Sequence, residues 1–310
     1  MKKLLFAVVA MAAMAMATSC SNEMAEIIPA GESVVSFHIN APEVATRAEF
    51  GDGTQANDLY YAVYLWDTKT NTSSIVGKIS KIDKTAPEYI AIDATVEFKL
   101  VNGNTYSILF WAENSASVAT IDWLNKTMTY NPTTANVETY DAFWAYVEPF
   151  RVTGRIDDKP VELYRPFAQV NIGTADFEDA VNAGTTIANA GIALTTGNTL
   201  DLVSGEVSGE VTTTYVPTAL PTEEFPIVGY KYMSMNYVLV GASKHLVELT
   251  FNYNDGADRE YTRTYNNVPV RRNYRTNIYG NLLTEDASYK ISIKPNVVVD
   301  PEYDYNADDK

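Results

Sequence analysis

Cys20 is the single cysteine among 310 residues, and its surroundings suit one kind of chemistry, the attachment of a lipid to a thiol. Two lysines near the start are followed by an apolar run over residues 4–17 and then by small residues before the cysteine. This pattern is typical of a secretory signal peptide, and the apolar run is shorter than the ~20 residues of a membrane-spanning helix. We therefore predict a signal peptide over residues 1–19 and a mature chain that carries diacylglycerol on the thiol of Cys20.

The side chains that most often carry out catalysis or bind metal ions are scarce in this sequence. His38 and His245 are the two histidines, and Cys20 has no second cysteine as a partner. This scarcity excludes Cys/His nucleophilic catalysis and a histidine-rich zinc site. The acid pairs at 157–158 and 223–224 could in principle hydrolyse glycosidic bonds, but adjacent acids in an acidic chain are usually solvated turns. We therefore predict no catalytic residue, no metal ligand and no cofactor, and hence no enzyme.

An Asp-Gly pair at 255–256 lies between two strand-like runs and is a strong signal for a β-hairpin. Asn254, Asp255 and Asp258 could supply oxygen ligands to calcium, but their spacing lacks the loop pattern of a known calcium site. We therefore expect a plain hairpin at this position rather than a metal site.

The composition favours a strand-rich protein that works outside the cell. The formal net charge is −16, which argues against binding to nucleic acid. The 21 tyrosines and the recurrent Thr and Val favour β-strands. Because the mature chain holds one cysteine, no disulfide can form within it, so its stability must come from its core.

Short strand-like segments recur along the chain, as in antiparallel β-sandwiches. Residues 34–39 alternate, with Val35, Phe37 and Ile39 on the apolar face. Helix is favoured at 119–124 and 177–182. We predict an all-β fold of two domains, a number that the chain length also suggests. The expected strands are 34–39, 59–66, 75–79, 94–100, 105–112, 141–146, 161–164, 167–172, 191–195, 199–202, 232–240, 246–253, 258–265, 277–282 and 289–293.

Arg47 stands between small residues in a segment, 40–53, that reads as an exposed loop rich in turn-forming residues. A lone arginine in such a loop is an accessible target for a protease that cuts after arginine. A cut between Arg47 and Ala48 would detach the whole strand 34–39 from the rest of the chain. We therefore predict that this strand is removable.

The four tryptophans leave a second interpretation open, because exposed aromatic rings can form platforms for sugars. Trp66, Trp111 and Trp144 lie in apolar strand-like segments, where a place in the core is favoured. Trp123 lies near a loop and is the tryptophan that we expect to be exposed.

Several motifs together resemble one protein family. The motifs are the lipoprotein start at Cys20, the loop Thr46-Arg47-Ala48, and the segments 106–113 (YSILFWAE), 165–170 (RPFAQV) and 268–284 (VPVRRNYRTNIYGNLLT). With them, nearly the whole mature chain resembles the fimbrillin-like lipoproteins of the Bacteroidales, the type V pilins and their relatives. The motifs are mostly structural, and they identify the fold better than the role.

This resemblance implies two transthyretin-like β-sandwich domains in tandem and a surface-exposed lipoprotein of the outer membrane, with palmitate on Cys20. It also implies a pilus subunit that an Arg-specific protease cuts after Arg47, and whose vacated groove takes a strand from a neighbouring subunit. The expected divisions are the signal peptide, 1–19; a lipidated leader with the removable strand, 20–47; an N-terminal domain, 48–160; a C-terminal domain, 161–299; and an acidic tail, 300–310.

The segment expected to donate a strand lies near the C-terminus. Its apolar residues are Tyr289, Ile291, Ile293, Val297 and Val299. Part of this segment is needed to complete the second domain, so only a short piece remains to donate. The roles of shaft, tip and anchor protein, the last two keeping the lipid, therefore stay open. A lipid-anchored glycan-binding protein of a nutrient-uptake system is the alternative, and a glycan or a host surface would then be its ligand.

Overall fold

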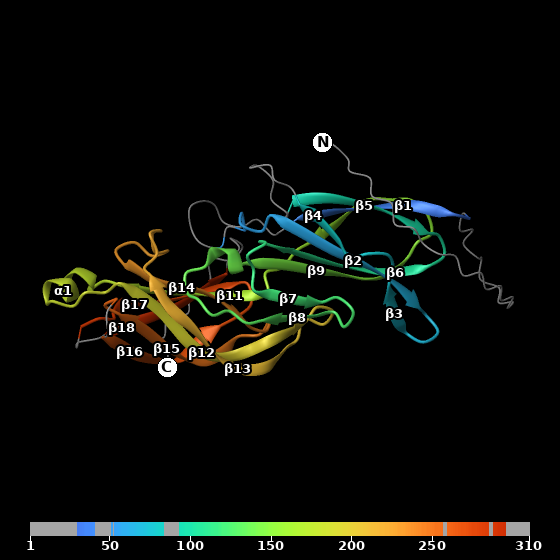
Figure 1. Cartoon of the computed structure of the whole chain (residues 1–310). Helices are drawn as coiled ribbons and strands as arrows, with labels where there is room; N and C mark the ends of the chain where they lie inside the picture. Colours follow the sequence, from blue (N-terminus) through green and yellow to red (C-terminus); the bar gives the residue numbers. More distant parts are fainter. Residues whose placement is uncertain are drawn as a thin grey trace.

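The computed structural model describes residues 30–40, 51, 53–83, 93–256, 259–284 and 288–295. Over these residues the regular secondary structure is almost entirely β-strand, arranged in four sheets that form two groups lying end to end (Figure 1). The predicted all-β fold is confirmed. Cys20, Arg47, Ala48, Val297 and Val299 lie outside the described residues.

The first group consists of two sheets packed face to face. One sheet has the order β10-β1-β5, with β10 at Ile156–Glu162, β1 at Glu32–Asn40 and β5 at Asp93–Val101. The other has the order β3-β2-β6-β9, at Thr72–Ile75, Asp58–Asp67, Thr105–Glu113 and Ala142–Arg151, and β4, Ser80–Asp83, also pairs with β2. Alternate apolar side chains from both sheets fill the space between them and form one buried core.

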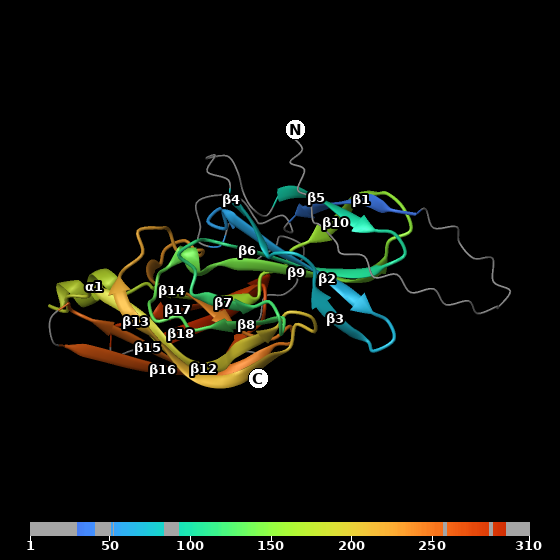
Figure 2. The ribbon, with the colours of Figure 1, turned by 45° about the vertical axis from the view of Figure 1, so that its right-hand side comes forward.

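The second group is built in the same way around a second core. One sheet has the order β14-β11-β17-β18, at Lys231–Leu239, Phe167–Thr174, Tyr274–Asn281 and Ser288–Pro295. The other has the order β16-β15-β12-β8-β7, at Glu260–Val270, His245–Asn254, Asn189–Asp201, Thr127–Tyr130 and Ala119–Asp122. The strand β13, Val207–Ala219, pairs with β12, and the helix α1, Phe177–Asn182, lies at the far end (Figure 2).

A third apolar cluster joins the two groups. Tyr64 and Trp111, from the outer face of the β2-β6-β9 sheet, share this cluster with Tyr130, Phe167 and Tyr237. The hairpin β7–β8 precedes β9 in the chain, yet it pairs with β12 of the second group. The two groups are therefore connected by packing and by strand pairing as well as by the chain. The domain bounds expected at 48–160 and 161–299 stay a prediction.

The two expected helices have different outcomes. The helix at 177–182 is confirmed as α1, whereas the segment expected as helix at 119–124 contains strand β7, Ala119–Asp122, paired with β8. Short apolar runs do not separate strand from buried helix by periodicity alone, and here the β-branched Thr120 and Ile121 fit the strand. The strand expected at 75–79 is also wrong, because β3 ends at Ile75 and β4 begins at Ser80.

Candidate functional site

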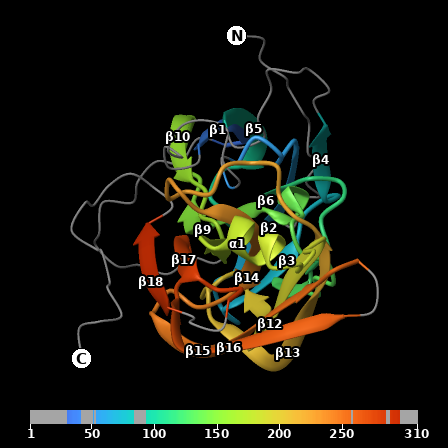
Figure 3. The ribbon, with the colours of Figure 1, turned by 90° about the vertical axis from the view of Figure 1, so that its left-hand side faces the viewer.

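The strand β1 occupies the centre of its sheet. It pairs antiparallel with β5 along its whole length, from Glu32 opposite Val101 to Asn40 opposite Asp93, and it pairs in parallel with β10. Within the described part of the chain, β1 is the only strand that either β5 or β10 pairs with. In the end-on view of Figure 3, β1 lies between these two neighbours. Removal of β1 would therefore leave two facing, unpaired strand edges.

The inner face of β1 is a central part of the first core. Val35, Phe37 and Ile39 are all completely buried. The ring of Phe37 contacts the rings of Phe98, Phe110 and Phe150, with centroid separations of 5.9, 6.0 and 5.8 Å. Removal of the strand would therefore leave an apolar groove where these three alternate side chains lie.

The outer face of β1 is polar. The backbone N–H of Asp158 donates to Ser36 Oγ over 2.7 Å, at a bulge in the pairing with β10. His38 is exposed, and its ring lies 3.4 Å from Thr95 Oγ1 and 3.9 Å from a carboxylate oxygen of Asp93. His38 is thus a surface residue, as the alternation predicts.

The segment 41–50 contains the expected cleavage position. The residues on either side of it, Asn40 and Gly51, are both held by one short connector, residues 163–165. Leu163 donates its backbone N–H to the carbonyl of Asn40 over 2.7 Å, and Arg165 Nη2 donates to the carbonyl of Gly51 over 2.6 Å. Between them, Tyr164 exchanges two backbone hydrogen bonds of 2.9 Å with Trp144 of β9. The connector 163–165 therefore fixes both flanks of this segment against the first group.

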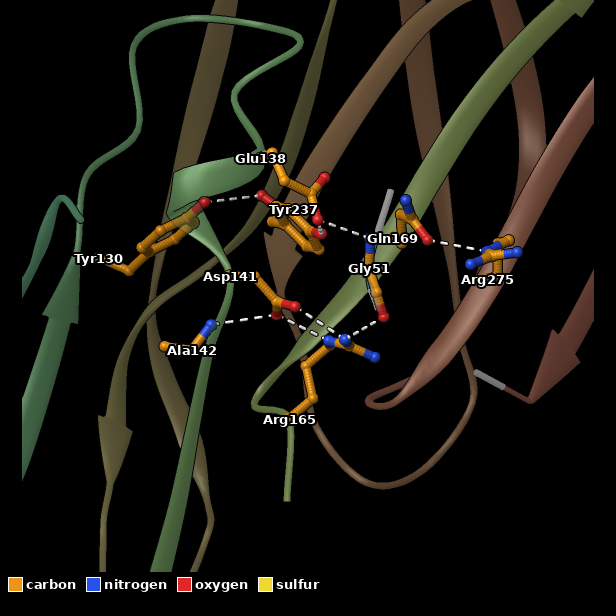
Figure 4. A network of polar contacts seen from close by, with 9 residues as sticks. All are labelled: Gly51, Tyr130, Glu138, Asp141, Ala142, Arg165, Gln169, Tyr237 and Arg275. Atoms are coloured by element: carbon orange, nitrogen blue, oxygen red, sulfur yellow. Dashed lines mark hydrogen bonds and ion pairs between the residues drawn. The ribbon is translucent and has the colours of Figure 1, made fainter. Parts of the chain in front are cut away.

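Gly51 is held by a buried polar network, which we call the Gly51 clamp and define as Glu138, Asp141 and Arg165 (Figure 4). The N–H of Gly51 donates to Glu138 Oε1 over 2.8 Å, so that both backbone polar groups of Gly51 are bonded to charged side chains. Tyr237, from β14, donates its hydroxyl to the same Glu138 oxygen over 3.3 Å. The clamp thus joins the chain after the cleavage position to both groups of sheets.

The centre of the clamp is an ion pair that is shielded from water. Arg165 contacts both carboxylate oxygens of Asp141 at 2.7 Å, and the two side chains are 1% and 0% exposed. Asp141 also accepts the backbone N–H of Ala142 over 3.0 Å, and the guanidinium lies 4.8 Å from the centroid of the Phe143 ring. Burial alone lowers the pKa of the Arg165 guanidinium, but the Asp141 carboxylate outweighs this effect and the pKa is raised. The pair is therefore charged and satisfied by hydrogen bonds.

Gly51 occupies a position that suits glycine alone. Its φ of +90° lies in the left-handed region, and an added Cβ would lie 3.1 Å from Gln169 Oε1, which accepts a hydrogen bond from Arg275 Nε over 2.8 Å. We expect Gly51→Ala to lower the free energy of unfolding by about 1–3 kcal/mol, because it combines backbone strain with crowding. Denaturant unfolding measures the loss, and Gly154→Ala is the matched control, since Gly154 has open space around it.

The motif at 268–284 has a structural role. It covers the end of β16, a turn, β17 and the three residues held by Asp176. The carboxylate of Asp176 accepts the backbone N–H groups of Leu282, Leu283 and Thr284, at 3.1, 3.1 and 2.8 Å. Burial raises the pKa of Asp176, but hydrogen bonds from Thr174 and from these residues outweigh it and hold the pKa below its ordinary value.

Three of the residues expected in a donor strand belong to β18, at the edge of the second group. Ile291 is 2% exposed in the second core and Ile293 is 6% exposed, whereas Tyr289 is 44% exposed and its ring lies 4.8 Å from that of Tyr265. In this structure β18 completes the sheet beside β17. The donor role of this segment stays a prediction.

None of the four tryptophans, all within the described residues, is exposed. Trp111 is completely buried and Trp144 is 6% exposed, while Trp66 and Trp123 are half-buried. Trp123 packs against the apolar cluster that joins the two groups, so the exposure expected for its ring is wrong.

The described residues contain no group of three or more His, Cys, Asp or Glu side chains placed to hold a metal ion. No helix in this part of the chain is both long and apolar enough to cross a bilayer.

The fold of this chain is similar to those of several solved proteins from the Bacteroidales. A proposed adhesin from Bacteroides ovatus is 12% identical, with a TM-score of 0.51, and the match covers 91% of this chain and 97% of that one. A proposed polysaccharide-binding protein (DUF1812) from Bacteroides thetaiotaomicron is 9% identical, with a TM-score of 0.50, over 88% and 99% of the two chains. The fimbrial anchor protein Mfa2 from Porphyromonas gingivalis is 13% identical, with a TM-score of 0.44, over 85% and 97%.

The first two of these likenesses confirm the fimbrillin-like resemblance at the level of an all-β sandwich fold. No curated protein matches the sequence. The model of a family of unknown function, DUF6562, matches residues 29–308, and the chain belongs to that family.

Proposed function

We propose that this protein is a structural subunit of a bacterial surface pilus, matured by cleavage after Arg47 and assembled by exchange of a strand between subunits. The observation that carries the proposal is the position of β1. This strand is the centre of its sheet, and a single segment, 41–50, joins it to the rest of the chain on its C-terminal side. One cut in that segment turns a central strand into a separate piece.

The groove that would remain is suited to a strand from another molecule. The facing edges of β5 and β10 would present unpaired N–H and C=O groups, which an added strand satisfies in full. The space vacated by Val35, Phe37 and Ile39 would accept apolar side chains at every second position. A subunit that gives one strand and receives one makes a head-to-tail contact, and such contacts propagate into a filament.

The proposed route places the protein on the outer surface of the outer membrane, held at first by the lipid on Cys20. Cleavage after Arg47 would remove the lipid and β1 together, whereas a tip or anchor protein of the same family of pili would keep both. The proposed adhesin from Bacteroides ovatus, with the same fold, fits such a fimbrial or adhesive role and not an enzyme. Other fimbrial subunits are the expected partners.

The proposal is tested by treating the purified lipid-free chain with an Arg-specific protease. The expected products are a new N-terminus at Ala48 and a ladder of SDS-resistant oligomers on an unheated gel. A protein that is cut at Ala48 and still runs as a monomer would contradict the shaft role.

The variant Arg47→Lys tests the cleavage position, because it keeps the positive charge but removes the side chain that the protease recognises. We expect complete loss of cleavage and of oligomer formation, while the thermal unfolding midpoint of the uncut protein stays unchanged. Arg155→Lys is the matched control, since Arg155 is an exposed arginine that forms an ion pair with Asp157. Cleavage of the Arg47→Lys variant at Ala48 would contradict this assignment.

The glycan-binding alternative receives less support from the structure. It relied on an exposed aromatic platform, and Trp123 is half-buried and packs against the cluster that joins the two groups. Calorimetry with glycans, on the wild type and on Trp123→Ala, distinguishes the two functions. Binding that depends on Trp123 would favour the alternative.

A further inference from the structure

The two flanks of the segment 41–50 are held in very different ways. Asn40 is the exposed last residue of β1, opposite Asp93 of β5 and Glu162 of β10, and a backbone hydrogen bond from Leu163 also ties it to the connector. Gly51 is buried, and it makes two short hydrogen bonds with charged side chains, one with Glu138 and one with Arg165. Hydrogen bonds to charged groups are roughly twice as strong as those between neutral groups. After a cut between the two flanks, the downstream end is therefore held by hydrogen bonds to charged side chains that do not depend on β1.

A second attachment follows Gly51 along the chain. Asn114 Nδ2 donates to the carbonyl of Gln55 over 2.9 Å, and the next residue, Ala56, is completely buried. The strand β2 then begins at Asp58. The chain after the cut thus has two successive anchors, first Gly51 and then Gln55, before it enters the sheet.

The first anchor, at Gly51, holds the chain outside the core that β1 fills. The side chains around Gly51 come from Glu138, the connector residue Arg165, Gln169 of β11 and Tyr237 of β14. None of these residues belongs to the core that β1 fills. An end held at Gly51 is bound at the junction between the two groups of sheets.

We propose that the Gly51 clamp retains the new amino-terminal end after cleavage, so that β1 is released while the groove stays open to a strand from another subunit. This inference rests on the proposed cleavage. Glu138, Asp141 and Arg165 are positioning residues in it: Glu138 and Arg165 bind the backbone of Gly51, and Asp141 holds Arg165 in place. The retained end cannot fray back towards β2 or enter the vacated groove.

The experiment is digestion of the cut protein with a non-specific aminopeptidase, followed by mass spectrometry of the trimmed chain. In the wild type, trimming is expected to stop within two residues of Gly51. In the double variant Asp141→Asn/Arg165→Met, we expect it to continue to the Gln55 anchor, a shift of about four residues. The double variant removes both buried charges together, which a fold usually tolerates better than the loss of one. An identical endpoint in both proteins would overturn the proposal.

Two further variants separate retention from general stability. Glu138→Gln keeps an oxygen for the N–H of Gly51 and should stop at the wild-type endpoint, whereas Glu138→Ala should shift it. Asn171→Ala removes a buried hydrogen bond of 2.9 Å to Asn277, between β11 and β17, and it should leave the endpoint unchanged. A shift in the Asn171→Ala protein equal to that in the clamp variants would assign the effect to lost stability and overturn the proposal.

A different cut tests whether the clamp retains the new end even if the natural cleavage after Arg47 does not occur. A recognition sequence for a different site-specific protease, placed within 44–49, gives the same kind of cut without any need for Arg47. If this cut also yields an end retained at Gly51, the clamp holds whether or not the natural protease cuts after Arg47. If the end is trimmed past Gly51 with either cut, the clamp is wrong and the cleavage proposal is unaffected.

Discussion

Phe37→Ala is expected to lower the free energy of unfolding of the uncut chain by about 3–5 kcal/mol. Phe37 is completely buried and contacts three other aromatic rings, so its truncation leaves a cavity that the surrounding strands cannot close. Denaturant unfolding of the purified uncut protein, followed by tryptophan fluorescence, measures this loss.

The same substitution should have no effect once the protein is cut and assembled, because residue 37 is then no longer part of the molecule. Phe98→Ala is the matched control: Phe98 is 1% exposed on β5, which stays with the subunit, so it should destabilise both the uncut and the assembled forms. Assembled fibres weakened equally by Phe37→Ala would show that β1 stays in place, and the proposed exchange would be wrong.

Arg165→Ala is expected to cause a loss of similar size, about 3–5 kcal/mol, because it leaves the buried carboxylate of Asp141 without its cationic partner. The double variant Asp141→Asn/Arg165→Met should lose much less, since no charge then remains to be buried at this position. Unfolding curves of the three proteins at one pH measure the difference. A loss below about 1 kcal/mol for Arg165→Ala, the size typical of an exposed ion pair, would contradict the buried pair.

The face of β1 that matters most could be predicted from sequence, because the alternation of Val35, Phe37 and Ile39 with polar residues is a local signal with a period of two. The strands that pair with β1 could not be predicted from the sequence. The strands β5 and β10 lie far along the chain, and nothing local marks which strand edges meet. The proposed function depends on the central place of β1 in its sheet, and this place is seen only in the structure.

The Gly51 clamp cannot be predicted from the sequence for a related reason. Arg165 and Asp141 are 24 residues apart, and a single arginine beside a proline reads as a surface residue until a buried partner is known. The motif 165–170 carries information only through the family resemblance. The one local signal was Asp141 itself, a carboxylate placed directly before an apolar strand that starts at Ala142.

The strand β13 shows the limit of pattern reasoning on an exposed surface. Its middle carries the run Val211 to Thr214, which is β-branched but mostly exposed, so no alternation of apolar and polar residues reveals it. What orders these residues is pairing with β12 over most of its length. The two strands form a hairpin through the short turn 202–206, and this pairing, rather than an apolar face, orders the exposed residues.

The identity of the first residue of the protein recovered from the cell surface tests the central claim most directly. If β1 is removed on the way to a filament, N-terminal sequencing of the protein from purified surface fibres should give Ala48, and peptides from 32–40 should be absent by mass spectrometry. A chain in those fibres that begins with lipidated Cys20 and still contains Phe37 would contradict cleavage after Arg47 and the exchange of strands that depends on it.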